Sequence, residues 1–415
     1  MADLKLIAQN SKADTIEVEI ERIVPGGAGF AHAEGRTIFV SLAAPGDIVR
    51  VRLERTRGKV GFASIIEILK PSPFRVEPPC PYFGRCGGCD FQQLNYETQL
   101  ATKVDIIRDC LHRIGRIDPI PHIEIHPSPQ QWHYRARANW QFDPRAQAFG
   151  YFERGSHRVC DVAECGVLVP ELESTLERLR AGIKTGSLEM PAVDIDAVTG
   201  DESVSVNPEF DIFSAREVTR KIGAETYCFN ANAFFQTNHE LLDSLVSEAI
   251  RDAQGETAID LYCGVGLFTL PLARRFKQVT GVESNRTSAE FARRNLENAL
   301  LTNAQVVVAR VDDWLRGNAN RHDSTPSVEP ANHAAHTQGL DFLLLDPPRT
   351  GAEPAVIEGI LSLKPKHVSY VSCDPATLAR DLKTLLAAGY SLDSIAAFDM
   401  FPQTHHVETI VHLRT

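Results

Sequence analysis

Long apolar runs are missing from this 415-residue sequence. No stretch approaches the roughly 18 consecutive apolar residues that a membrane span requires, and the N-terminus carries neither an export signal nor an Arg-rich targeting pattern. We therefore expect a soluble, cytoplasmic protein without membrane association. The nine cysteines are an odd number in a chain without a secretion signal. A disulfide framework is not indicated, and metal binding or catalysis becomes the better expectation for these cysteines.

The sequence also has no excess of positive charge. The formal net charge of -11 argues mildly against a general polyanion binder, because affinity for nucleic acids draws on a basic surface. The charge is nevertheless uneven along the chain. Residues 47–70 carry six Lys or Arg against three acids, and residues 135–158 carry five Arg against two acids. The acidic net charge therefore does not exclude a basic face.

The length favours two to three domains. Short β-branched runs separated by Gly-rich turns at residues 15–69 predict a small five-stranded β-barrel, and the prolines after residue 70 mark a boundary. Apolar residues at helical spacing predict a helix at 96–114. The pattern of residues 121–215 predicts a mostly β domain with one amphipathic helix at about 172–183. We place the domains at 1–70, 71–220 and 221–415.

From about residue 226 onward, apolar strands alternate with helices, which predicts an α/β domain with a doubly wound, largely parallel sheet. The polar stretch 316–339 has no periodicity and is interpreted as a surface loop.

One strand of that domain ends in a glycine turn, DLYCGVG, at residues 260–266, and Glu283 ends the next strand. Glycines at the carboxyl end of a strand allow backbone to approach a ligand closely, and an acid in the place of Glu283 can hold ribose hydroxyls. The spacing is not the phosphate-binding G-x-G-x-x-G pattern. S-Adenosylmethionine, which has no pyrophosphate, is therefore favoured over a dinucleotide.

Three motifs follow in order: LLLDPPRTG at 343–351, VSCDPATLARDL at 371–382 and DMFPQTHHVETIVHL at 399–413. Together with NANAFFQTN at 230–238 and the glycine turn, they resemble the signature motifs of the RNA uracil-5-methyltransferase family. The resemblance implies a Rossmann-like methyltransferase domain. The N-terminal barrel is similar to a TRAM domain, an OB-like RNA-binding module, and this extends the resemblance to nearly the whole chain.

The chemistry explains why these residue types are needed. Carbon 5 of uracil is a poor nucleophile, so a thiolate must first add to carbon 6, and by resemblance Cys373 supplies it. A base must then remove the carbon 5 proton, and Glu408 is the matching residue. Asp346 would face the same crevice. Without the resemblance, Cys373 would be interpreted as a small buried apolar residue, Glu408 as an acid at the end of a strand and Asp346 as a helix cap.

The resemblance also implies a set of cofactor contacts. The residues expected to bind S-adenosylmethionine are Gln236, Tyr262, Leu267, Glu283, Asp312 and Asp346. Leu267 stands where some relatives have Asn, so only backbone or apolar contact is expected there. The alignment at Asp312 could slip by one residue.

The cysteines Cys80, Cys86 and Cys89 follow a C-x5-C-x2-C pattern. With Cys165 as a distant fourth ligand, four thiolates suit an iron–sulfur cluster or a tetrahedral zinc, and the family pattern favours a 4Fe-4S cluster in the central domain. Cys160 is the competing fourth ligand. A radical S-adenosylmethionine enzyme would need C-x3-C-x2-C, so a structural cluster is expected.

The barrel and the cluster together resemble bacterial enzymes that act on 23S ribosomal RNA, and tRNA remains the alternative substrate. The target uridine would be flipped out of its stack beside Cys373. Two other classes are weighed against this interpretation: an N-methyltransferase, which would need an aromatic residue where Arg349 stands, and a non-catalytic iron–sulfur RNA-binding protein. We expect a monomer.

Overall fold

The computed structural model describes residues 15–189, 193–210, 215–319 and 339–415. The surface loop predicted at 316–339 lies largely outside the described residues. Contacts divide the chain into two compact units. The first comprises Met1–Gly84, Cys89–Thr102 and Gln403–His405, and the second comprises Arg85–Gly88, Lys103–Pro402 and His406–Thr415.

Six short strands form the sheet of the first unit. They are β1 (Thr15–Glu19), β2 (Arg22–Ile23), β3 (Gly29–Ala33), β4 (Arg36–Val40), β5 (Ile48–Arg57) and β6 (Val60–Lys70). Their order is β1-β5-β6-β4-β3-β2, and β4 pairs with β6 in parallel. The predicted β-rich N-terminal module is therefore present, with six strands instead of five. Over the described residues, its hydrogen-bond ladder stays open and does not close into a barrel.

Alternation of apolar and polar residues gives this sheet one buried face. Ile38 and Val40 of β4 and Val49 and Val51 of β5 are fully buried in a shared core, while the residues between them point to the other side. Buried Asp47 ties the segment that follows β6 to the module, because its carboxylate accepts hydrogen bonds from the Ser72 backbone and the Arg75 guanidinium. The end of the module is thus fixed by a buried ion pair.

Helix α1 (Tyr96–Cys110) continues into one π-helical turn, η1 (Leu111–Gly115), as expected for 96–114. A five-stranded sheet of order β10-β9-β8-β11-β12 follows in the second unit. Its strands are β8 (Arg137–Asp143), β9 (Ala148–Phe152), β10 (Val159–Asp161), β11 (Asp194–Thr199) and β12 (Val204–Asn207). The amphipathic helix α2 (Pro170–Thr185) buries Leu172, Leu176 and Leu179. The predicted mostly β region with one helix is confirmed.

The largest sheet has eight strands in the order β17-β16-β15-β18-β19-β21-β20-β7. They are β7 (Ile123–His126), β15 (Gly255–Leu261), β16 (Phe276–Glu283), β17 (Ala304–Val308), β18 (Phe342–Leu345), β19 (His367–Ser372), β20 (Ser391–Phe398) and β21 (Glu408–Arg414). Strands β15 to β19 run parallel, and β21 is antiparallel to both of its neighbours. A hairpin of β13 (Val218–Ile222) and β14 (Glu225–Phe229) and the 3-10 turn η2 (His239–Leu241) precede β15 in sequence.

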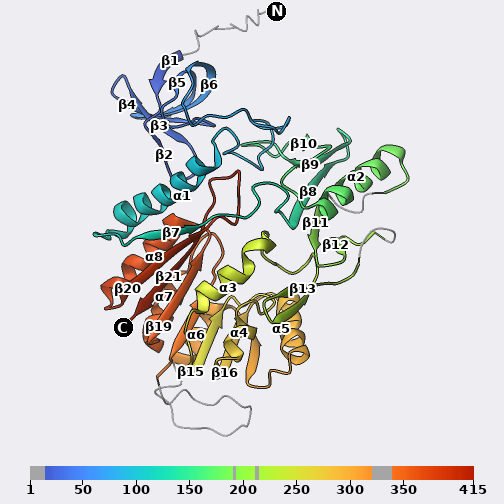
Figure 1. The fold of residues 1–415 in the computed structure, drawn as a ribbon, viewed down its shortest axis with the longest axis vertical. Helices are drawn as coiled ribbons and strands as arrows, with labels where there is room; N and C mark the ends of the chain where they lie inside the picture. Colours follow the sequence, from blue (N-terminus) through green and yellow to red (C-terminus); the bar gives the residue numbers. More distant parts are fainter. Residues whose placement is uncertain (1–14, 190–192, 211–214, 320–338) are drawn as a thin grey trace, which may run out of the picture. The chain divides into compact units, whose positions relative to one another are not determined.

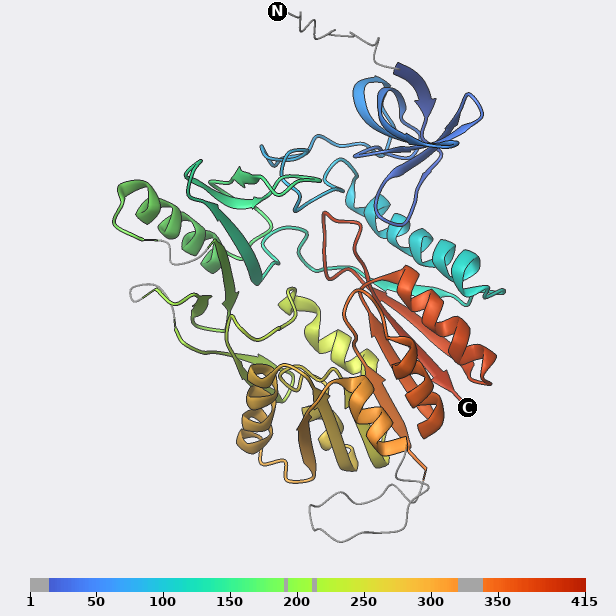
Figure 2. The ribbon, with the colours of Figure 1, turned by 180° about the vertical axis from the view of Figure 1, so that it is seen from behind.

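Helices cover both faces of the eight-stranded sheet, which confirms the doubly wound α/β class (Figure 1). One core takes residues from α3 (Leu242–Ile250), α4 (Thr269–Ala273) and α5 (Arg286–Asn298). The other takes residues from α1, α6 (Val311–Ala319), α7 (Pro354–Leu363) and α8 (Pro375–Ala387), and Figure 2 shows α7 and α8 from their own side. The apolar run of β18, FLLL, follows from this burial on both faces.

Strand β7 departs from the expected arrangement. The sequence places it in the central domain, whereas it pairs in parallel with β20 and forms an edge of the eight-stranded sheet. A four-residue strand so far from its partner in sequence leaves no local pattern that would reveal this pairing. The domain boundaries at residues 70 and 220 stay a prediction.

Candidate active site

The glycine turn after β15 has a backbone that only small residues adopt easily. Gly264 and Gly266 have φ values of +54° and +93°, and Tyr262 also lies in the left-handed region with φ of +64°. A Cβ atom on Gly266 would lie 2.9 Å from Leu270 Cδ1. The turn therefore exposes its backbone at the carboxyl end of the strand, where ligands bind in doubly wound sheets.

A pocket opens at this turn. Four of the six residues predicted to bind the cofactor line it: Gln236, Tyr262, Leu267 and Asp346. Phe234 and Phe268 contribute apolar wall. The backbone carbonyl of Leu267 accepts a hydrogen bond from the Tyr227 hydroxyl at 2.9 Å, and the side chain of Leu267 is apolar. The mixture of exposed backbone, aromatic wall and few polar groups suits a nucleoside with an amino-acid tail.

The other two predicted cofactor residues lie outside the lining of that pocket. Glu283 accepts hydrogen bonds from the backbone of Gly264 at 3.0 Å and of Asn285 at 2.6 Å, so its carboxylate braces the glycine turn. Asp312, in the first turn of α6, is paired with Arg310 at 3.0 Å and with Arg316 at 2.9 Å. The hydrogen bond from Arg310 lowers the pKa of Asp312. Both carboxylates are thus already engaged by the protein.

Strand register brings the predicted catalytic residues to the same edge of the sheet. Ser372 pairs with Thr409 across β19 and β21, so Cys373 and Glu408 occupy the next positions on neighbouring strands. Asp346 follows β18, the other neighbour of β19, and its backbone N–H donates to the Leu261 carbonyl at 3.3 Å. Gln236 Nε2 donates to Asp346 Oδ2 at 3.3 Å, which links the pocket to the sheet edge that carries Cys373 and Glu408.

Two carboxyl groups at this edge, those of Glu408 and Asp346, have raised pKa values. Burial raises the pKa of Glu408 well above its ordinary value, and the neighbouring Asp346 raises it further. Burial likewise raises the pKa of Asp346 to about 7. Glu408 Oε1 is buried without a hydrogen-bond partner among the described residues. An unpartnered buried carboxyl is costly to keep, and such groups concentrate where chemistry needs them.

Cys373 sits directly before the N-terminus of α8 and is half-buried. Burial, together with Glu408 and Asp346, raises the pKa of its thiol to about 12, while Arg349 acts in the opposite direction. At neutral pH this raised pKa favours the neutral thiol at this position. Arg349 is the cation that favours the thiolate.

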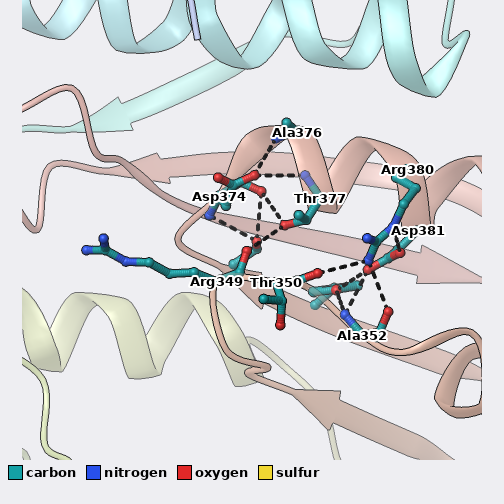
Figure 3. Close-up of polar contacts among 10 residues, drawn as sticks. Arg349, Thr350, Ala352, Asp374, Ala376, Thr377, Arg380 and Asp381 are labelled. Atoms are coloured by element: carbon teal, nitrogen blue, oxygen red, sulfur yellow. Dashed lines mark hydrogen bonds and ion pairs between the residues drawn. The ribbon is translucent and has the colours of Figure 1, made fainter. Parts of the chain in front are cut away.

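The segments on both sides of Cys373 are held rigidly. The Asp374 carboxylate caps α8 by accepting from the backbone of Ala376 at 3.0 Å and of Thr377 at 2.8 Å (Figure 3). Arg380 donates to the carbonyls of Thr350 and Ala352, and its Nε donates to Asp381.

The Asp381 carboxylate in turn accepts from the Ala352 backbone at 3.0 Å and from the Tyr370 hydroxyl at 2.7 Å. Figure 3 shows the Arg349 side chain extending away from this network. The loop after β18 is thus fixed to α8, and the Arg349 guanidinium is left out of the bracing.

Sequence reasoning missed one acid beside this site. Asp260 is fully buried at the end of β15, where Thr269 Oγ1 donates to its Oδ2 at 2.5 Å. Its Oδ1 has no hydrogen-bond partner among the described residues, and burial raises the pKa of its carboxyl to about 7. The signal was visible in the sequence, because Asp260 is the only acid within an otherwise apolar strand end.

The four cysteines predicted to hold an iron–sulfur cluster are divided between the two units. Within the described ranges, no three or more His, Cys, Asp or Glu side chains gather into a group that could hold a metal ion. Cys80 and Cys89 belong to the first unit and Cys86 and Cys165 to the second, so a four-thiolate site at these positions stays a prediction. Cys160, the competing fourth ligand, is buried and accepts a hydrogen bond from Arg85 Nε at 3.2 Å.

None of the described helices combines the length and the apolar character needed to cross a lipid bilayer.

Two family profiles match the sequence. One, described as tRNA (uracil-5-)-methyltransferase, matches residues 209–415. The other, described as the TRAM domain of tRNA (uracil(54)-C(5))-methyltransferase, matches residues 16–74. The two matches fall on the large α/β sheet and on the N-terminal sheet respectively.

Relatives match over nearly the whole chain. The 23S rRNA (uracil(1939)-C(5))-methyltransferase of Pectobacterium atrosepticum is 34% identical, and the alignment covers 96% of this chain and 93% of the relative. An uncharacterized RNA methyltransferase of Thermosynechococcus vestitus is 32% identical, with coverage of 97% and 98%. The crystal structure of Pyrococcus abyssi tRNA (uracil-54, C5)-methyltransferase with S-adenosyl-L-homocysteine superposes with a TM-score of 0.71, at 27% identity over 95% of this chain and 100% of that one.

Proposed function

The chain belongs to the RNA (uracil-5-)-methyltransferase family, and from that premise we propose that it methylates carbon 5 of one uridine in 23S ribosomal RNA, with Cys373 as nucleophile and Glu408 as base. The observation that carries this proposal is the adjacency of Cys373 and Glu408 at the ends of β19 and β21. Asp346 directly follows β18, the other strand that flanks β19, and its charge raises the pKa of both residues.

S-Adenosylmethionine would supply the methyl group from the pocket that Gln236, Tyr262, Leu267 and Asp346 line. The carboxylates of Glu283 and Asp312 are proposed to act on that pocket from outside its lining, Glu283 by holding Gly264 in place. Asp346 joins the two halves of the site, since it accepts from Gln236 on the cofactor side and acts on Glu408 on the catalytic side.

The residues of the chain then account for the proton movements. The Cys373 thiol loses its proton to solvent, and its sulfur forms a bond to carbon 6 of the uracil. The electron pair of the double bond between carbons 5 and 6 shifts towards the carbonyl oxygen on carbon 4, which makes carbon 5 nucleophilic. After carbon 5 has gained its methyl group, Glu408, which must first have lost its own proton to solvent, accepts the carbon 5 proton. The electron pair of that C–H bond re-forms the double bond between carbons 5 and 6, and the Cys373 sulfur leaves as a thiolate. Because burial raises the pKa of Glu408, its ionised form is a stronger base than an exposed carboxylate.

The test uses two variants that stop the reaction at different points. Cys373→Ala removes the nucleophile, so no methyl transfer and no covalent adduct with RNA containing 5-fluorouridine should form. Glu408→Gln keeps the nucleophile but not the base, so an adduct with unmodified RNA should accumulate after methyl transfer. Full methylation by Cys373→Ala would overturn the nucleophile assignment. Turnover by Glu408→Gln at the wild-type rate would remove Glu408 from the mechanism.

The substrate is decided separately. The 34% identical relative is named for 23S rRNA, whereas the superposed crystal structure is that of a tRNA enzyme, so tRNA is the second candidate. Mass spectrometry of nucleosides from purified 23S rRNA and tRNA of a deletion strain should show loss of 5-methyluridine from the 23S pool alone. Loss from the tRNA pool alone would establish the second candidate, and loss from neither would refute both.

The iron–sulfur cluster enters none of these steps, and it stays a prediction from the cysteine pattern. Iron and acid-labile sulfide in anaerobically purified protein test it independently. Four iron atoms per chain would confirm the prediction made from the cysteine pattern, and their absence would remove it.

A further inference from the structure

A row of aromatic and basic side chains crosses the N-terminal sheet. Strand pairing places Arg22 opposite Phe30, Phe30 opposite Phe39, Phe39 opposite Phe62, and Phe62 opposite Arg55. Five of the six strands thus contribute one residue each to a continuous line. We call this line the aromatic ladder, defined by Arg22, Phe30, Phe39, Phe62 and Arg55.

The ladder lies on the face opposite to the core of that sheet. Ala31, Ile38 and Ala63 neighbour the three phenylalanines in sequence, point the other way and are buried. The phenylalanines themselves are half-buried, so part of each ring meets solvent. The core of the sheet is complete without these rings, and three phenylalanines in a line on a solvent face need a reason beyond burial.

The geometry of the ladder is that of a platform with charged ends. The ring centres of Phe30 and Phe39 are 6.0 Å apart, and those of Phe39 and Phe62 are 5.6 Å apart. Arg22 lies 4.8 Å from the centre of the Phe30 ring, and Arg55 lies 4.4 Å from that of Phe62. Each end of the apolar row therefore carries a guanidinium held over a ring, which suits an anionic ligand that also has apolar faces.

We propose that the aromatic ladder binds an unpaired segment of the substrate RNA, with bases stacking on the phenylalanine rings and phosphates contacting Arg22 and Arg55. The proposal rests on the proposed function, which makes RNA the substrate. The ring spacing exceeds the roughly 3.4 Å between successive stacked bases of a duplex strand, so the ladder fits bases that are separated from each other. Phenylalanine offers no hydrogen-bonding group, so binding should tolerate any base sequence.

Binding of fluorescein-labelled octauridylate to the full-length protein tests the ladder, and a hairpin of the same length in nucleotides serves as the paired probe. Phe39→Ile keeps an apolar residue that favours strands but removes the ring. It should weaken octauridylate binding by about 5-fold or more and leave hairpin binding unchanged, because stacking on one ring is worth that much. Phe74→Ile is the matched control, since Phe74 is 45% exposed in the same unit and lies outside the ladder.

Two further variants separate stacking from charge and from damage to the fold. Phe39→Trp enlarges the ring and should bind octauridylate at least as tightly as the wild type. Arg55→Gln should reduce the slope of log Kd against log salt by about 0.7, whereas Phe39→Ile should leave that slope unchanged. Far-ultraviolet circular dichroism checks that the sheet is intact in each variant.

Wild-type affinity of Phe39→Ile for octauridylate would overturn the proposal, and so would equal losses for octauridylate and the hairpin. Weakening by Phe74→Ile to the same extent would also overturn it. A methylation assay keeps the two proposals apart: Phe39→Ile should raise KM for RNA and leave kcat unchanged. An absence of methyl transfer by the wild-type protein would refute the proposed function while the binding result for the ladder still stood.

Discussion

Lys103 and Asp399 form an ion pair whose side chains are both fully buried in the second unit. Lys103 Nζ donates to Asp399 and also to the carbonyl of Phe401 at 3.0 Å. These contacts anchor the start of the loop that leads from β20 to Glu408, and the Tyr134 hydroxyl supports the same loop by donating to the Pro402 carbonyl at 2.9 Å. Removing one partner leaves a buried charge uncompensated.

Lys103→Met should therefore lower the free energy of unfolding of the second unit by about 3–5 kcal/mol. The double variant Lys103→Met with Asp399→Leu replaces the pair with apolar groups of similar volume and should regain most of that loss. The control is Lys277→Met, because Lys277 pairs with Glu256 on the surface, where both side chains are more than half exposed. That change should cost about 1 kcal/mol or less.

Urea unfolding followed by tryptophan fluorescence measures these differences in the right part of the chain, because Trp132, Trp140 and Trp314 all belong to the second unit. A loss for Lys103→Met no larger than that for Lys277→Met would refute the reasoning. A double variant as unstable as the single variant would show that lost packing, and not the unpaired carboxylate, causes the damage.

Three further predictions concern the same unit. Burial lowers the pKa of His412 to about 4, below its ordinary value of about 6.5, so the folded state favours the neutral ring. The stability that this neutral ring contributes is complete above pH 6.5 and is lost as the pH falls toward 4, by up to about 1.4 kcal/mol per pH unit. The urea midpoints at pH 7 and pH 5 should therefore converge in His412→Gln. Gly266→Ala should abolish S-adenosylmethionine binding as measured by calorimetry and should destabilise the second unit by about 1–3 kcal/mol. The reason is that φ of residue 266 is +93° and that the added Cβ would meet the Leu270 side chain. Wild-type affinity for S-adenosylmethionine would contradict this prediction. Because the pKa of the Cys373 thiol is raised to about 12, the rate of adduct formation with 5-fluorouridine RNA should rise with pH between 7 and 9, and a flat profile would show that RNA binding itself lowers that pKa.

The parts of the site that sequence predicts are those fixed by strand ends. In a doubly wound sheet the carboxyl ends of parallel strands meet at one edge, so the ends of β15, β18 and β19 had to bring Tyr262, Asp346 and Cys373 together. Glu408 begins an antiparallel strand, and its place beside Cys373 followed from the family resemblance and not from any local pattern. The register of β19 with β21 supplies the physical reason.

Other features could not be predicted, because they depend on pairings between distant segments. Nothing in residues 123–126 indicates that β7 joins β20, and no spacing rule joins Lys103 to Asp399, 296 residues later. Burial also depends on three-dimensional packing. Asp260 could be identified as an acid in an apolar strand, but its raised pKa follows only from its enclosure at the end of β15.

The net charge of -11 argues against a nucleic-acid binder, and the proposed role of the aromatic ladder would meet this objection. A protein that relies on phosphate contacts alone loses affinity steeply with salt, by a factor set by the number of contacts. Stacking on rings does not depend on salt in this way. With only Arg22 and Arg55 proposed to contact phosphates, the ladder should contribute a slope of about 1.4 in log Kd against log salt for single-stranded RNA. A slope of 5 or more for octauridylate would mean that a basic surface elsewhere dominates binding, and that the phenylalanines of the ladder are secondary.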